Sequence, residues 1–93
     1  MPKILECNAT VCAYNADNKC HAFAITVGGG GNCPMCDTGI IQSQKGGIPN
    51  VIGGVGACKE EDCQFNNSLE CSANGIKVKL HTSHADCATF KQK

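Results

Sequence analysis

The sequence predicts a small metal-stabilised fold, mainly of β-hairpins and irregular segments with little helix, made of two tandem four-cysteine modules. Three observations lead to this prediction: the chain has only 93 residues, nine of them are cysteines, and eight of these cysteines recur at one fixed offset. The large side chains that fill a core are scarce, with no Trp, three Phe and one Tyr. A chain of this size and composition needs disulfides or metal ions to hold its fold.

The cysteines reveal an internal duplication. Eight of them follow the spacing C-x4-C-x7-C-x15-C twice, and the second copy begins 51 residues after the first. Nine of the 33 positions in 7–39 are identical to their mates in 58–90, where chance would give roughly two. The matched residues include Asn15 and Asn66, which we expect to be turn residues. The two sets are Cys7, Cys12, Cys20 and Cys36, and then Cys58, Cys63, Cys71 and Cys87.

The duplication divides the chain into a first module at 1–39, a Gly-rich apolar linker at 40–56 and a second module at 57–93. We expect each module to be held together by its own local site. The linker is too apolar for a plain spacer, because it contains Ile40, Ile41, Ile48, Val51, Ile52 and Val55. It is therefore predicted either to pack over the modules or to contact a protein partner, including a second copy of the chain, and a flexible connector is the alternative.

Local signals predict a hairpin in each module, because turn-forming residues lie at 14–18 and 65–68. After the second turn, apolar residues alternate with lysines over 76–80, which is the pattern of a half-buried strand. Residues 25–27 begin the same strand in the first copy. A pattern that resembles a helix cap predicts a short helical turn at 83–88.

Four cysteines per module suit a metal site. Zn²⁺ takes four soft or borderline ligands in a tetrahedron, and four cysteines are a common structural set. Zinc binding contributes about 10–16 kcal/mol in small peptides, which is enough to fold a short module. We therefore predict two zinc ions, one for each set of four cysteines. Iron, an Fe–S cluster and disulfides are the alternatives that use the same residues.

Cys33 is the one cysteine whose repeat mate is not a cysteine, since the second copy has His84 at that position. It forms a C-x-x-C motif with Cys36. Three interpretations stay open: a metal knuckle in which Cys33 or His84 replaces or supplements a ligand, a redox dithiol, and a spare thiol. A thioredoxin-type dithiol needs a βαβ context that the sequence lacks. We expect Cys33 to be the least essential cysteine for folding.

The motif C-x-[YF]-N-x4-C-x-A-x2-I-x-V, which starts at Cys12 and again at Cys63, is followed in the second copy by C-A-T-F at 87–90. These residues resemble the bacterial family catalogued as domain of unknown function 1540. Both copies match, over about 66 of the 93 residues, and the first departs at Gly39, where the family pattern has Phe. The resemblance implies a small bacterial protein that binds metal, and it supplies no reaction or substrate.

Charge and composition exclude several classes of function. Eight basic and eight acidic residues give a net charge of zero, so we expect no binding to nucleic acid or to a membrane surface. No stretch approaches 18 consecutive apolar residues, so we expect no membrane span, and because we also expect no leader, a cytoplasmic protein is predicted. Because no catalytic set can be assembled, we predict a non-catalytic adaptor or protein-interaction module. The alternatives are a metal buffer or sensor, and a thiol redox protein that acts through Cys33 and Cys36.

Overall fold

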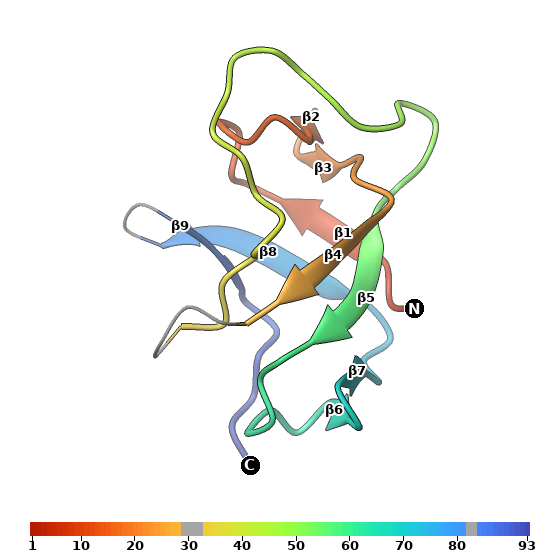
Figure 1. Ribbon diagram of the computed structural model, residues 1–93, viewed down its shortest axis with the longest axis vertical. Helices are drawn as coiled ribbons and strands as arrows, with labels where there is room; N and C mark the ends of the chain where they lie inside the picture. Colours follow the sequence, from red (N-terminus) through yellow and green to blue (C-terminus); the bar gives the residue numbers. More distant parts are fainter. Residues whose placement is uncertain (29–32, 82–83) are drawn as a thin grey trace.

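The computed structural model describes residues 1–28, 33–81 and 84–93, and the side chains of His81 and His84 are not among the described parts. Within these residues the chain forms nine short strands and no helix (Figure 1). The described residues accordingly contain no helix that could cross a membrane. The predicted small fold of hairpins and irregular segments with little helix is confirmed.

The strands follow one another in two equivalent series. The first series is β1 (Ile4–Cys7), β2 (Asn15–Ala16), β3 (Lys19–Cys20) and β4 (Ala24–Val27). The second is β5 (Gly54–Cys58), β6 (Asn66–Asn67), β7 (Glu70–Cys71), β8 (Ile76–His81) and β9 (His84–Cys87). The pairs β2–β3 and β6–β7 are the predicted hairpins.

Both hairpins turn in the same way. The two central residues have positive φ in each, at 55° and 62° for Asp17 and Asn18 and at 54° and 69° for Ser68 and Leu69. Two positive φ angles in a two-residue loop define a type I′ turn, which matches the twist of the flanking strands. Asp and Asn tolerate this conformation, whereas Leu69 adopts it against its own preference. In the second copy, the fold of the repeat therefore outweighs the conformational preference of Leu69.

The first strand of each repeat pairs with a strand of the other repeat. β1 pairs in parallel with β8 of the second repeat, and β5 pairs in parallel with β4 of the first. The register of the first pair is Ile4 with Ile76, Glu6 with Lys77 and Cys7 with Val78. The register of the second pair is Val55 with Ile25, Ala57 with Thr26 and Cys58 with Val27. Each residue lies 51 positions from its mate in the other ladder, and both ladders have a bulge at the same place.

Further pairings close these strands into a ring in the order β1, β8, β9, residues 34–36, β4 and β5. β8 and β9 are antiparallel, and the segment 34–36 takes the place of β9 beside β4. A bridge between Met35 and Asp86 joins that segment to β9, and a bridge between Lys3 and Gly54 joins β1 to β5. Both bridges connect a residue with its own repeat mate, so a pseudo-twofold axis passes through them.

The core inside this ring belongs to both repeats. Ile4 of the first repeat and Val55 and Ile76 of the second are its largest fully buried side chains. The described hydrophobic core is therefore shared between the repeats. A repeat of this length cannot bury its own apolar face, and here each repeat covers that face with a strand of the other.

The linker lies over the first repeat, as the yellow-green segment above β2 and β3 in Figure 1 shows. Ala13 N donates a hydrogen bond of 2.6 Å to Ile40 O, and Ile48 N donates one of 2.9 Å to His21 O. The last three residues assigned to the linker, 54–56, belong to β5. Only Val55 among the large apolar residues of this segment is fully buried, and all four isoleucines remain exposed.

The helical turn predicted at 83–88 is wrong for the described residues of that segment. Residues 84–87 form β9, which pairs with β8 through Lys79 and Asp86 and through Leu80 and Ala85. The neighbouring strand supplies backbone partners along the whole segment, and this outweighs a capping pattern that has no apolar periodicity behind it. Ser83 lies outside the described residues.

Candidate metal centres

Two small cavities each collect the four cysteines of one repeat. The first is lined by Cys7, Cys12, Cys20 and Cys36, and the second by Cys58, Cys63, Cys71 and Cys87. Each encloses about 20 Å³, which is room for about one water-sized atom. Every residue that lines the second cavity has its repeat mate in the lining of the first. The two sets defined by the offset are thus brought together as two equivalent groups.

Each cysteine lies at the same place in the fold as its mate in the other repeat. The first cysteine of each set ends the opening strand, β1 or β5, and the third ends the hairpin, β3 or β7. The second lies in a tight turn, in which Cys12 N donates to Ala9 O at 3.0 Å and Cys63 N donates to Glu60 O at 3.1 Å. The fourth lies on the segment that returns beside β4 or β8.

Asn15 and Asn66 tie the hairpin to the first cysteine of each set. Asn15 Nδ2 donates a hydrogen bond of 2.7 Å to Cys7 O, and Asn66 Nδ2 donates one of 2.9 Å to Cys58 O. Both residues begin a hairpin strand, and neither has a positive φ. This role was not predicted from the sequence, although the spacing of eight residues from cysteine to asparagine is present in both copies.

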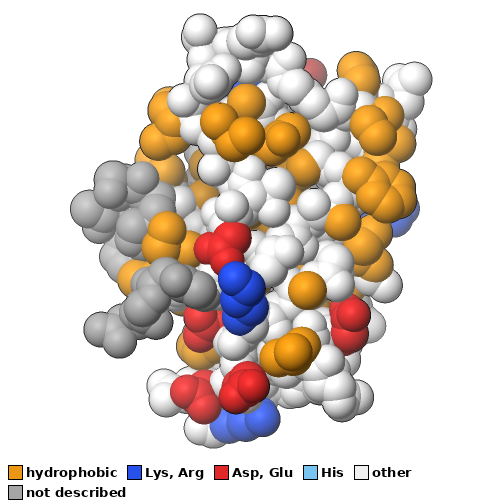
Figure 2. Space-filling model, in the orientation of Figure 1, with side chains coloured by type: hydrophobic (Ala, Val, Ile, Leu, Met, Phe, Trp, Pro, Cys, Tyr) orange, Lys and Arg blue, Asp and Glu red, His pale blue; other side chains and the backbone are white. Residues whose placement is uncertain are grey.

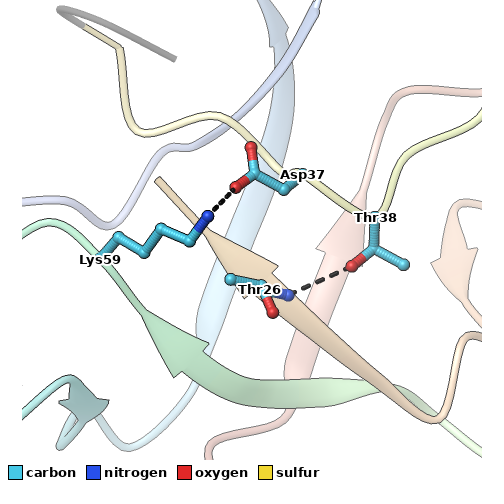
Figure 3. A network of polar contacts seen from close by, with 4 residues as sticks. All are labelled: Thr26, Asp37, Thr38 and Lys59. Carbon is cyan, nitrogen blue, oxygen red and sulfur yellow. Dashed lines mark hydrogen bonds and ion pairs between the residues drawn. The ribbon is translucent and has the colours of Figure 1, made fainter. Parts of the chain in front are cut away.

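Threonines hold the segment that carries the fourth cysteine. Thr38 Oγ1 accepts a hydrogen bond of 3.2 Å from Thr26 N, as Figure 3 shows, and Thr89 Oγ1 accepts one of 3.0 Å from Lys77 N. Asp37 also pairs with Lys59 at 3.3 Å, a partly exposed ion pair that contributes little by itself. The first repeat therefore closes in the same way as the second, although Gly39 stands where the second repeat has Phe90.

The environment of the fourth cysteine of each set, Cys36 or Cys87, favours the protonated thiol. Burial raises the pKa of Cys36 and of Cys87 to about 11, and backbone hydrogen bonds offset only part of this effect. Neighbouring thiolates raise each pKa further, and they come from the same set: Cys20 and Cys12 act on Cys36. Thiols placed in this way give up their protons when a cation replaces them.

A comparison with known protein families adds one finding. The model of the family described as Domain of Unknown Function (DUF1540) matches residues 5–45 and 57–90. The chain belongs to the DUF1540 family. The two matched segments correspond to two tandem copies of the domain, in agreement with the duplication of the cysteines. No curated protein and no solved structure matches the chain.

The two remaining candidate ligands, Cys33 and His84, are not placed at either cysteine cavity by the described structure. Cys33 is half-buried and lines neither cysteine cavity. The backbone of His84 begins β9, but its side chain is outside the described part of the chain. Among the described residues, no three cysteine, histidine or carboxylate side chains are already arranged to hold a metal ion. Binding would therefore require the thiols of one cavity to turn toward a common point. The donor set, four thiols around room for one atom, fits a thiolate-binding metal.

Proposed function

We propose that this DUF1540 protein is a non-catalytic zinc protein with two sites of four cysteine ligands each. One observation carries the proposal: eight cysteines separate into two equivalent groups around cavities with room for about one atom each. Zinc is the metal most often held by four thiolates in a structural site. Cys7, Cys12, Cys20 and Cys36 would hold the first ion, and Cys58, Cys63, Cys71 and Cys87 the second. A reducing compartment such as the cytoplasm would keep these thiols available.

A structural role is favoured over catalysis or thiol chemistry. A site with four cysteine ligands leaves no open position for a substrate or an activated water. The redox alternative requires Cys36 to react together with Cys33. Burial raises the pKa of the Cys36 thiol to about 11, so only a small fraction is the reactive thiolate at neutral pH.

Native mass spectrometry of protein made in metal-replete cells tests the sites. We expect two zinc ions per chain, identified by mass and by elemental analysis. Cys12→Ser and Cys63→Ser are a matched pair of variants, because they occupy the same position of the two sets, and each should reduce zinc binding. Full retention of two zinc ions in both variants would contradict the assignment.

The proposed adaptor role has a candidate surface beside the first site. An apolar groove of about 200 Å³ is lined by Val11, Ile40, Ile41 and Leu80, and it reaches Cys12 and Cys36. All four apolar side chains are at least 43% exposed, which is unusual for residues that serve only the fold. Figure 2 shows hydrophobic side chains gathered over the upper part of one face, and most of the visible charged side chains below them.

The second repeat provides an internal comparison for this groove. The mates of Val11, Ile40 and Ile41 are Asp62, Lys91 and Gln92, which are polar. The same backbone therefore folds without an apolar surface at this place. Phe90 lines the second cavity at the position where the first repeat has Gly39. We propose that the groove accepts a large apolar side chain from a partner protein, in the place that Phe90 fills in the second repeat.

Selection of peptides from a random library against the zinc-loaded protein tests this surface. We expect peptides that share an aromatic or large aliphatic residue, and we expect Gly39→Phe to abolish their binding by filling the groove. Lys91→Ala, on the equivalent face of the second repeat, is the matched control and should leave binding unchanged. Peptides that bind Gly39→Phe as well as the wild type would show that the groove is not the contact surface.

A further inference from the structure

Each of the two cysteine cavities is lined in part by residues of the other repeat. Val78 and Ala85, from the second repeat, line the cavity of the first set of cysteines. Val27 and Pro34, from the first repeat, line the cavity of the second set. Val27 and Val78 are each only 3% exposed, so these walls are part of the common core.

Two cysteines of each set also make backbone contacts with the other repeat. The first cysteine of each set pairs in a parallel ladder with the valine of the other repeat: Cys7 with Val78, and Cys58 with Val27. The fourth cysteine of each set donates its N–H to the other repeat as well. Cys36 N donates to Ala85 O at 2.8 Å, and Cys87 N donates to Pro34 O at 2.8 Å. The backbone of two of the four cysteines of each set is thus held in place by the opposite repeat.

We propose that the two sites load cooperatively, so that the chain passes from metal-free to doubly loaded with little of the singly loaded form. This inference rests on the proposed metal-binding function. A metal ion at one site fixes the strand and the returning segment that carry its cysteines. Those same elements form the wall and the hydrogen-bond acceptors of the other site, which is then ordered before its own metal arrives. Binding of the first ion includes the free-energy cost of ordering the shared core. The second ion does not bear this cost and therefore binds more tightly.

The strength of the coupling between the two sites can be measured from the fraction of chains that carry one metal ion. Two independent and equal sites give about half of the chains with one metal at half saturation, by simple binding statistics. Coupling between sites typically changes affinity by about 5–150-fold. With a coupling of about 100-fold, the singly loaded form falls to about one chain in ten at the same saturation.

The experiment is a zinc titration of the reduced, metal-free full chain, followed by native mass spectrometry at one equivalent of zinc. We expect the metal-free and the two-zinc species to dominate. A singly loaded species at about half of all chains would overturn cooperative loading while leaving two zinc sites in place. Absence of zinc binding at every ratio would overturn the proposed function and this inference together.

Val27→Ala and Val78→Ala form a matched pair that locates the coupling. Val27→Ala keeps all eight cysteines and lies in the first repeat, but we expect it to weaken zinc at the second set about tenfold more than at the first. Val78→Ala should have the reverse effect. The readout is alkylation of free thiols at substoichiometric zinc, mapped by peptide mass, with far-UV circular dichroism to confirm folding. Weakening confined to the variant's own repeat would contradict the proposal, and the wild-type titration stands even if a variant does not fold.

Discussion

Substitution of Gly53 by Ala should destabilise the protein strongly, because this residue joins the linker to the hairpin that carries Cys20. A Cβ at Gly53 would lie far inside van der Waals contact with Ala22 O and 3.1 Å from Cys20 Sγ. Gly53 N also donates a hydrogen bond of 2.8 Å to Cys20 O, and Gly53 O accepts one of 2.9 Å from Ile4 N. The obstacle is a backbone atom, so the linker must move away from the hairpin.

The size of the effect follows from these contacts. Overpacking costs about 1–3 kcal/mol, and weakening two backbone hydrogen bonds adds about 1 kcal/mol for each. We expect a loss of about 3–5 kcal/mol in the free energy of unfolding. Because each kcal/mol shifts the Tm of a chain of this length by about 4–8 °C, the Tm should fall by at least about 12 °C. Gly39→Ala is the matched control, because the nearest atom to its Cβ would be Cys36 O at 3.5 Å, an ordinary contact that costs less than about 0.5 kcal/mol.

Thermal unfolding of the zinc-loaded variants, followed by circular dichroism at one fixed zinc excess, measures this difference. We also expect Gly53→Ala to bind zinc more weakly at the first set of cysteines, since the new methyl group crowds Cys20. Equal Tm values for Gly53→Ala and Gly39→Ala would show that the linker does not pack on the hairpin in this way.

Asn15→Ala should cost about 2 kcal/mol in urea unfolding and Asn66→Ala about 1 kcal/mol, because Asn15 is 3% exposed and Asn66 is half-buried; equal losses would contradict this. Cys33→Ser should leave two zinc ions per chain by native mass spectrometry, and loss of one would make Cys33 a ligand. Because burial raises the pKa of Cys36 and Cys87 to about 11, zinc must displace their protons. Zinc affinity should therefore fall as the pH is lowered from 8 to 6, and a competition titration that shows no change would exclude thiolate ligands.

The duplicated parts of the fold were predictable because their signals are local. Turn residues at 14–18 and 65–68 predict the hairpins, and the alternation after Gly75 predicts β8. The fixed offset of the cysteines predicts which of them are equivalent, and the structure places each set around one cavity.

The exchange of strands could not be predicted from the same signals. The offset shows that β1 and β5 are equivalent, but it does not show whether each pairs within its own repeat or with the other. Ile4 and Ile76, for example, are both apolar strand residues that would suit either arrangement, and their parallel pairing leaves no local trace in the sequence. The role of Asn15 was also hidden, because its hydrogen bond to Cys7 O depends on the hairpin folding back onto β1.

X-ray absorption at the zinc edge of the loaded protein identifies the atoms that are bound to the metal. We expect a single class of sites with four sulfur ligands at about 2.3 Å and no nitrogen or oxygen ligand. A spectrum that requires a histidine nitrogen would place His84 or another histidine at a site. A first shell with fewer than four sulfur atoms would contradict the assignment of all eight cysteines to two four-thiolate centres.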